Sequence, residues 1–301
     1  MELQVASGKS EVAKMSIFSR SSAARQGHST FSQPSNGILV HMYGDVNCSD
    51  DDQTLIIQDF GEKFYAEQLC YMAVKNLELT PSVAPLFALA HHSLESWSPP
   101  NETVPCTEDC AREFVLRVRF IPSEKEINRL SSADNRMFNY LFQQIRSDFI
   151  NDRIVYHGQL INQEHQLGLG VIDMVRYGKQ HDIDLSDLRN LPPQDFIPVC
   201  AKNNFKKFLD KHRLSLNFKR HLEKEYKQYE TDTVVSAQLT YIQSILRNAE
   251  HYGMETFEVL MVKDSCDDCK AEVNVKPHDD KFPGLNIYER KVIQTLAFLP
   301  K

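Results

Sequence analysis

Two short motifs carry residues that could bind a metal ion. Cys266-Asp-Asp-Cys269 has the spacing of half a zinc site, but zinc usually takes four ligands from two such pairs, and only His278 follows closely. His91 and His92 are adjacent, and neighbouring residues on a strand point to opposite faces, so this pair cannot readily hold one ion. We therefore expect no metal site, an acidic surface hairpin with free thiols, and a structural role for both histidines.

Motifs for phosphoryl transfer are missing from the sequence. A tyrosine kinase needs a glycine-rich loop, a strand lysine, a His-Arg-Asp catalytic loop and a metal-binding Asp-Phe-Gly. None of these occurs, and His212-Arg213-Leu214 lacks the aspartate. A phosphate-binding G-x-x-x-x-G-K-[ST] loop and a nucleophile elbow are also missing. We expect no catalytic residues and no cofactor in this chain.

The segment 202–229 concentrates positive charge. It holds nine Lys or Arg residues and three Asp or Glu residues, a balance of +6 within a chain of net charge −7. One interpretation is the solvated face of a long helix. The other is a positive surface that attracts an acidic peptide or an anionic lipid.

Composition limits the class of protein. A chain of 301 residues, 42% hydrophobic and 25% charged, can build two or three domains. Its net charge argues against a nucleic-acid-binding protein, and no run of roughly 18 apolar residues predicts a membrane span. Seven cysteines with no secretory signal indicate reduced, intracellular thiols. Residues 1–36 are serine-rich and resemble a disordered tail, with a mitochondrial transit peptide as the alternative.

Three stretches differ in their hydrophobic period. The first, 37–122, predicts a helix at 66–77 among strands at 38–43, 55–57, 86–90 and 114–120, the order of a ubiquitin-like lobe. The chain's single tryptophan, Trp97, precedes Ser-Pro-Pro-Asn, which predicts a corner of that lobe rather than a ligand platform. The second stretch, 133–252, predicts an all-helical lobe with helices at 137–149, 162–175, 202–229 and 233–251, the last closed by Gly253.

The third stretch, 254–301, returns to a strand pattern. Strands are expected at 257–263, 271–275 and 285–288. So few residues indicate an incomplete β lobe. A ubiquitin-like lobe, a helical lobe and the start of a β lobe give an α+β, multi-lobe fold in the order of a FERM module: a β-grasp lobe, an all-α bundle and a partial PH-like lobe.

Short motifs along this order resemble the FERM region of Janus kinases. In the first lobe they are Glu67-Gln-Leu-Cys70, Leu79-Thr-Pro81, Leu86-Phe-Ala-Leu89, Trp97-Ser-Pro-Pro-Asn101 and Arg117-Val-Arg-Phe120. In the second they are Tyr140-Leu-Phe142, Asp148-Phe149, Leu167-Gly168 and Val171-Ile-Asp-Met174, and Phe257-Glu-Val259 resembles the entry to the third. The sequence departs from the family at Ile121-Pro122, where a longer aromatic run is usual, and no Src-homology-like or kinase domain follows within the 301 residues.

The resemblance implies a non-catalytic, receptor-docking role for this chain in JAK-STAT signalling. In Janus kinases the helical lobe grips the proline-rich juxtamembrane segment of cytokine receptors. A loose match to that lobe gives five candidate receptor-binding residues: Phe218, Lys219, Arg220, Leu222 and Tyr226. For the three apolar ones, Phe218, Leu222 and Tyr226, the pattern favours core packing over receptor contact.

Partner and location follow from the same resemblance. We expect the cytoplasmic tail of a cytokine receptor as partner, with anionic lipid as a further one, and a cytoplasmic, peripheral position at the inner face of the plasma membrane. The alternative function is a FERM adaptor that links membrane phosphoinositides or receptor tails to the cytoskeleton.

Overall fold

The computed structural model describes most of the first two lobes and the backbone of the third. The described residues are 36–44, 54–94, 96–109, 111–154, 163–192, 195–198, 220, 222–224, 226, 233–249 and 252–253, together with the strand backbones between 255 and 297. The chain separates into two compact units, one built from Met1–Met42, Val46–Leu77 and Ala88–Leu116 and the other from the remaining residues. The tail at 1–35 and most of the helix expected at 202–229 lie outside the described residues.

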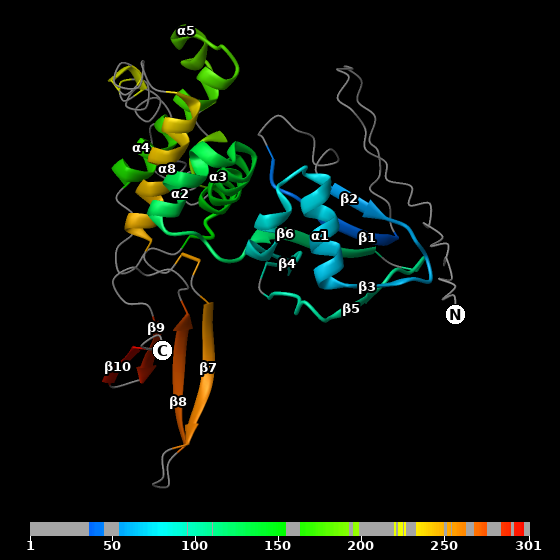
Figure 1. Cartoon of the computed structure of the whole chain (residues 1–301). Coiled ribbons are helices and arrows are strands. Elements are labelled where there is room, and N and C mark those ends of the chain that lie inside the picture. Colours follow the sequence, from blue (N-terminus) through cyan, green and yellow to red (C-terminus); the bar gives the residue numbers. More distant parts are fainter. Residues whose placement is uncertain are drawn as a thin grey trace, which may run out of the picture. The chain divides into compact units, whose positions relative to one another are not determined.

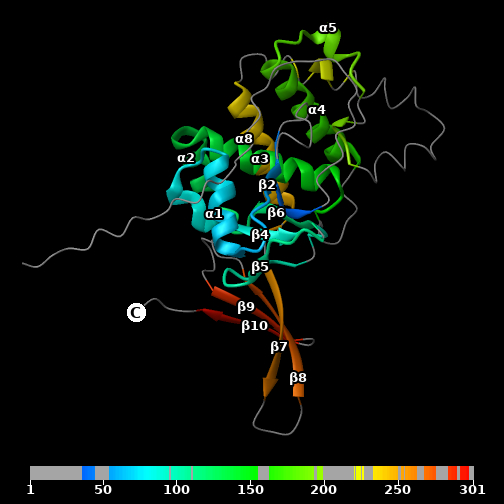
Figure 2. The ribbon, with the colours of Figure 1, turned by 90° about the vertical axis from the view of Figure 1, so that its right-hand side faces the viewer.

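The first unit is a mixed four-stranded sheet with one long helix. The strands lie in the order β2 (Thr54–Ile57), β1 (Gly37–His41), β6 (Ala111–Val118) and β4 (Phe87–His91). β1 pairs antiparallel with β2 and parallel with β6. The helix α1 (Ala66–Asn76) lies against one face of this sheet, as Figures 1 and 2 both show. This arrangement is the ubiquitin-like lobe that the sequence predicts.

Alternating burial explains how β6 joins the core of the first unit. Phe114 and Leu116 are buried, while Glu113 and Val115 between and beside them are half-exposed. On α1, Leu69, Ala73 and other apolar residues at helical spacing are buried in the same way. A short ribbon of β3 (Lys63–Tyr65) and β5 (Thr103–Pro105), which the sequence does not predict, completes the unit.

Trp97 lies at a corner of the first unit. It forms an isolated β-bridge with Ala90, and the backbone N–H of Ser98 donates to the carbonyl of Leu89 at 2.8 Å. The segment therefore folds back along β4. This agrees with the architectural interpretation of the Trp97-Ser-Pro-Pro turn.

The second unit contains a helical bundle. Its helices are α2 (Glu124–Ala133), α3 (Asn135–Ile150), α4 (Gln163–Gln180), the short α5 (Leu185–Leu188) and α8 (Val234–Asn248). Side-chain oxygens of Ser123, Asp134 and Thr233 accept hydrogen bonds from backbone amides in the first turns of α2, α3 and α8. α8 packs against α2, α3 and α4.

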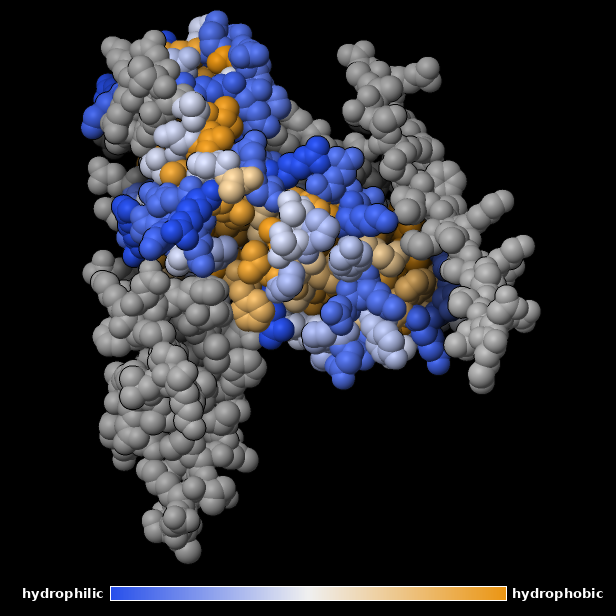
Figure 3. Space-filling view, in the orientation of Figure 1, coloured by the Kyte–Doolittle hydropathy of each residue, from blue (hydrophilic) through white to orange (hydrophobic). Residues whose placement is uncertain are grey.

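Three details of the bundle differ from the sequence predictions, one of them being the short α5, which the sequence does not predict. The hydrophobic pattern of the sequence does not predict α2, because Ile127 is the only buried residue of this helix. Hydrophilic side chains cover α2 on the face that Figure 3 shows. α8 ends at Asn248 with Ala249 as its C-cap, so Gly253, whose φ is 78°, does not close it. The turn at Gly253 instead lies against Ile121, whose Cγ1 would be 2.5 Å from an added Cβ.

Four antiparallel strands follow the bundle. They lie in the order β10 (Val292–Ala297), β9 (Gly284–Glu289), β8 (Asp268–Val275) and β7 (Glu255–Val262). β7, β8 and β9 overlap the three strands predicted at 257–263, 271–275 and 285–288, and β10 adds a fourth. The segment is therefore a meander, in agreement with the expected β character of the third stretch.

Candidate functional site

The predicted receptor-binding residues separate into three groups. Phe218 and Lys219 lie outside the described residues. Arg220 is helical and exposed, as is Lys224 one turn later. Leu222 is fully buried and Tyr226 is half-buried. Of the described candidates, Arg220 and Tyr226 are therefore open to a ligand.

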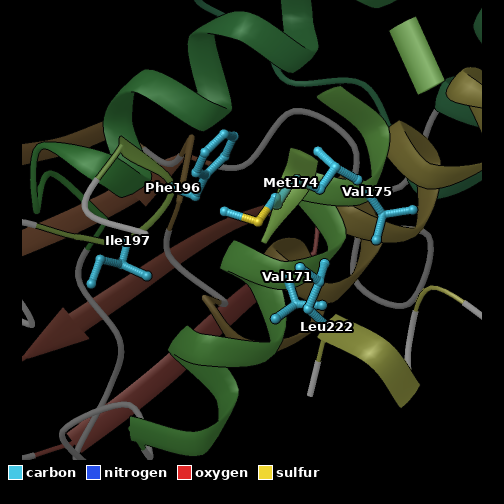
Figure 4. Packing of buried hydrophobic residues seen from close by; sticks show 7 residues of the cluster. Val171, Met174, Val175, Phe196, Ile197 and Leu222 are labelled. Atoms are coloured by element: carbon cyan, nitrogen blue, oxygen red, sulfur yellow. The ribbon is translucent and has the colours of Figure 1, made fainter. Parts of the chain in front are cut away.

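Leu222 belongs to the core of the helical bundle. The same buried cluster contains Val171, Met174 and Val175 of α4 together with Leu188, Phe196 and Ile197, and Figure 4 shows Leu222 beside Val171. Its side chain has no solvent-exposed surface, so it takes the core-packing alternative and cannot contact a peptide in this structure. It anchors the helical segment that carries Arg220 and Tyr226.

An ion pair holds the same segment from the outside. Glu223 accepts from Arg189, which follows α5, at 2.9 Å. Both side chains are partly exposed, so this pair adds little stability, on the order of 0–1 kcal/mol. Leu222 on the inner side and this ion pair on the outer side thus both connect the turn to the α4–α5 region.

A cavity of about 510 Å³ opens beside Tyr226. It is lined by the C-terminal end of α4, the turn into α5 and the start of α8: Gly178, Lys179, Asp182, Ile183, Asp184, Tyr226, Thr233 and Val234. One lysine and two aspartates supply its charge, so its lining is not the basic rim that the sequence predicts. The exposed bases in the described part of this segment, Arg220 and Lys224, do not line it.

The Asp184 carboxylate at this cavity is engaged as a helix cap. It accepts from the Ser186 hydroxyl at 2.6 Å and from the Asp187 backbone N–H at 3.0 Å, and these bonds lower the pKa of Asp184. Its charge is thus maintained at neutral pH. A ligand in the cavity would meet Tyr226 and Ile183 as apolar contacts beside a fixed negative charge.

A buried polar network lies elsewhere in the second unit. The guanidinium of Arg117 donates to both carboxylate oxygens of Asp148, at 3.0 and 2.5 Å, and to the hydroxyl of Tyr43. The Tyr252 hydroxyl donates to Asp148 at 2.7 Å. Burial lowers the pKa of Arg117, but the hydrogen bonds and charge of Asp148 outweigh it and raise that pKa overall. Burial and the nearby carboxylate raise the pKa of Tyr43 to about 12.

A second buried network joins α3 to α4. Arg146 of α3 and Arg176 of α4 donate to opposite oxygens of Asp173, at 2.5 and 2.8 Å. Burial raises the pKa of Asp173, but the two guanidinium groups outweigh it, and the pKa is lowered. In each network guanidinium groups donate to a buried carboxylate that joins separate segments of the unit, which indicates scaffolding of the bundle rather than acid–base chemistry.

The two adjacent histidines diverge, as the sequence predicts. The ring of His91 lies 5.6 Å from that of Phe114, and its Nε2 is 3.5 Å from the Ser98 hydroxyl. His92 faces Glu113 of β6 instead, with Nδ1 3.5 Å from Oε2. Cys266 lies outside the described residues, and Cys269 is described only as backbone in β8.

Comparison with known proteins decides the family. A model of the FERM F1 ubiquitin-like domain matches residues 38–125, and a model of the FERM F2 acyl-CoA binding protein-like domain matches residues 131–247. The chain belongs to the FERM family. Residues 38–125 form its F1 lobe and residues 131–247 its F2 lobe, in the order that the sequence motifs indicate.

Curated relatives of this FERM chain include Janus kinases. The chain is 21% identical to tyrosine-protein kinase JAK1 of Danio rerio over 87% of its length, and 30% identical to tyrosine-protein kinase JAK3 of Rattus norvegicus over 40%. It spans only 26% and 12% of those proteins. The resemblance to Janus kinase FERM regions that the motifs indicate is thereby confirmed.

Solved structures support the fold alone. The MyTH4-FERM MF2 domain of Dictyostelium discoideum myosin VII matches 88% of the chain with a TM-score of 0.56 at 12% identity, covering 50% of that structure. A mutant of the same domain gives 0.54, with 51% covered. Within the described residues, no helix is both long and apolar enough to span a bilayer.

Proposed function

We propose that this chain is the receptor-docking FERM region of a Janus-kinase-like tyrosine kinase. It binds the proline-rich juxtamembrane segment of a cytokine receptor and thereby positions a kinase at the receptor in JAK-STAT signalling. The observation that carries the proposal is the conjunction of F1 and F2 FERM lobes with sequence similarity to JAK1 and JAK3.

The geometry around Tyr226 supports peptide docking there. A proline-rich segment adopts an extended polyproline II helix, which docks against aromatic side chains on rigid surfaces. Tyr226 is half-exposed at a cavity and is held by a turn whose Leu222 is locked into the core. Such a preorganised ring contributes affinity because little side-chain freedom is lost on binding.

Positive charge on the same helical turn supports recognition of a receptor tail near the membrane. Arg220 and Lys224 are exposed, and Phe218 and Lys219 of the proposed site precede them in sequence. Exposed charges of this kind raise the association rate more than they raise affinity. We therefore assign Arg220 and Lys219 to steering and Tyr226 to anchoring, at the cytoplasmic face of the plasma membrane.

The chain's role in this proposal is binding, without catalysis. The two buried polar networks, at Asp148 and Asp173, consist of ion pairs, and the domains recognised in the chain are FERM domains. Kinase activity belongs to the relatives that it resembles.

Fluorescence anisotropy with labelled juxtamembrane receptor peptides tests the proposal. Tyr226→Ala should weaken binding about tenfold, the effect of losing a buried aromatic anchor worth about 1.4 kcal/mol. Arg220→Glu should slow association and weaken binding about three- to tenfold at low salt. Tyr71→Ala on α1 and Arg129→Glu on α2, both exposed, are the matched controls and should leave affinity unchanged.

Several results would contradict this function. A folded wild-type chain that binds none of the peptides would exclude receptor docking. Equal losses of peptide affinity in Arg129→Glu and Arg220→Glu would show that the peptide is attracted by unspecific charge and not by a defined site. Circular dichroism at 222 nm on each variant separates a lost contact from a lost fold.

The exposed bases favour one second candidate, a FERM adaptor that binds anionic phosphoinositides. That function predicts sedimentation with vesicles containing phosphatidylinositol bisphosphate, with binding that falls as salt rises. Peptide binding by a chain that does not sediment with such vesicles would exclude it.

A further inference from the structure

Three side chains from adjacent strands of the F1 lobe converge on one point. Glu113 belongs to β6, which lies between β1 and β4 in the sheet (Figure 1). His41 ends β1, and His92 directly follows β4. The central carboxylate is therefore flanked by one imidazole from each side, although the three residues are far apart in sequence.

Strand register explains the approach of His41 to Glu113. In the parallel β1–β6 pair, Leu39 lies opposite Glu113 and His41 lies opposite Val115. His41 and Glu113 are therefore diagonal neighbours on the same face of the sheet. Phe114, the next residue of β6, points to the opposite face of the sheet and is buried. All three triad side chains are partly exposed, so the triad lies at the surface of the lobe.

The distances in this triad fit an ion better than direct hydrogen bonds. Oε2 of Glu113 lies 3.8 Å from Nε2 of His41 and 3.5 Å from Nδ1 of His92, and all three ligand atoms lie within 4.8 Å of one another. Hydrogen bonds between nitrogen and oxygen usually measure about 2.7–3.2 Å. Ligand atoms around tetrahedral zinc stand about 3.4 Å apart, given bond lengths near 2.0–2.1 Å.

A neighbouring hydroxyl orients His41, the least exposed of the three ligands. Nδ1 of His41 is 3.0 Å from the hydroxyl of Thr54, its partner in the β1–β2 ladder. This contact orients the ring so that Nε2 faces Glu113. Metal-binding histidines in proteins characteristically have such a second contact at the other ring nitrogen, which fixes the tautomer and the ring plane.

We propose that His41, His92 and Glu113 form a binding site for a divalent transition-metal ion of the zinc class. Two imidazoles and one carboxylate are a common ligand set for such ions, and water completes the coordination at an open position. The side chains of His41, Glu113 and His92 are 19%, 38% and 65% exposed, so an ion can enter from solvent. The bound ion cross-links β1, β6 and the turn after β4, and so stabilises the F1 lobe independently of receptor docking.

Metal titration of the full chain tests this site. The starting protein carries Cys266→Ser and Cys269→Ser, so that the Cys-Asp-Asp-Cys motif cannot supply the signal, and is freed of metal by chelation. We expect it to take up one equivalent of Zn²⁺, measured by competition with a chromophoric chelator. Co²⁺ should give the visible absorption of a site with nitrogen and oxygen ligands.

Three substitutions distinguish the triad from other histidines. His92→Ala and Glu113→Gln should each weaken Zn²⁺ binding at least tenfold, while His181→Ala, an exposed histidine on the helical lobe, should leave it unchanged. Zn²⁺ should also raise the melting temperature reported by Trp97 fluorescence in the starting protein and not in His92→Ala. Absence of stoichiometric binding by the folded chain, or unchanged affinity in both triad variants, would overturn the proposal.

Discussion

Replacing each of the three glycines of α4 by alanine probes how closely this helix packs against its neighbours in the bundle. A Cβ added at Gly168 would meet nothing within 4 Å. At Gly178 it would lie 2.6 and 2.9 Å from the two Cδ atoms of Leu188, a fully buried side chain. At Gly170 it would lie 2.9 Å from the backbone carbonyl oxygen of Phe196 and from Cγ2 of Ile197. The added methyl group therefore meets open space at Gly168, a side chain at Gly178, and both a backbone carbonyl and a side chain at Gly170.

These distances give a graded expectation for substitution by alanine. Gly168→Ala should stabilise the bundle by about 1 kcal/mol, the difference in helix propensity between the two residues. Gly178→Ala and Gly170→Ala gain the same propensity but incur an overpacking cost of about 1–3 kcal/mol. Gly170→Ala should be the most destabilising of the three, because a backbone carbonyl yields less readily than a leucine methyl group.

Urea denaturation followed at 222 nm measures this series, since α-helices dominate the ellipticity there. Both tight-glycine variants should unfold at lower urea than Gly168→Ala, by about 1–3 kcal/mol in the free energy of unfolding. Because Gly178 also lines the cavity beside Tyr226, its variant should weaken receptor-peptide binding as well. Equal stabilisation by all three substitutions would refute the packing of α4 against Leu188, Phe196 and Ile197.

Three further predictions concern buried charge, helix capping and pH. Asp148→Ala leaves Arg117 without its bidentate partner and should destabilise the second unit by about 3–5 kcal/mol in thermal unfolding at 222 nm. Asp148→Asn keeps a hydrogen-bond acceptor and should destabilise it less. An unchanged melting temperature in Asp148→Ala would contradict the buried ion pair. Ser123→Ala removes the N-cap of α2 and should cost about 1 kcal/mol in urea denaturation, while Ser131→Ala near the end of the same helix should be close to neutral; equal effects would contradict the cap. Because the pKa of Tyr43 is about 12 in the folded chain and about 10 when unfolded, the folded state holds more protons between these values. Its contribution to stability should be complete below pH 10 and lost as pH rises to 12, and Tyr43→Phe should flatten that part of a pH-dependent denaturation series.

Strong periodicity allowed the main elements to be predicted from the sequence. α1 and α3 bury wide apolar stripes, and β6 alternates clearly, so the hydrophobic pattern alone indicates their type. α2 buries only Ile127, and β3 and β5 have three residues each, so neither pattern nor length separates them from loops. Elements that contribute little to the core leave little trace in the sequence.

The two candidate sites could be predicted from the sequence even less completely than the fold. Local spacing predicted a charged helix at 202–229, of which only Arg220, Leu222, Glu223, Lys224 and Tyr226 are described. It weighed core packing against receptor contact for Leu222, and the choice depends on where α4 and α5 pack. The His41–His92–Glu113 triad could not be predicted from local spacing either. It requires the strand order β1, β6, β4, which brings together residues separated by more than 20 positions along the chain. His91 and His92 contact different neighbours, as adjacent strand residues should, and the neighbours of His92 in the triad come from other strands.

Competition for a receptor tail is the most direct measurement of the central claim. A cytokine-receptor cytoplasmic segment immobilised on a sensor surface is loaded with a full-length Janus kinase, and this FERM chain is then added in increasing amounts. We predict that the chain displaces the kinase in a saturable manner, and that Tyr226→Ala does so only at about tenfold higher concentration. Binding of the folded chain beside the kinase without displacement, or no binding at all, would contradict it.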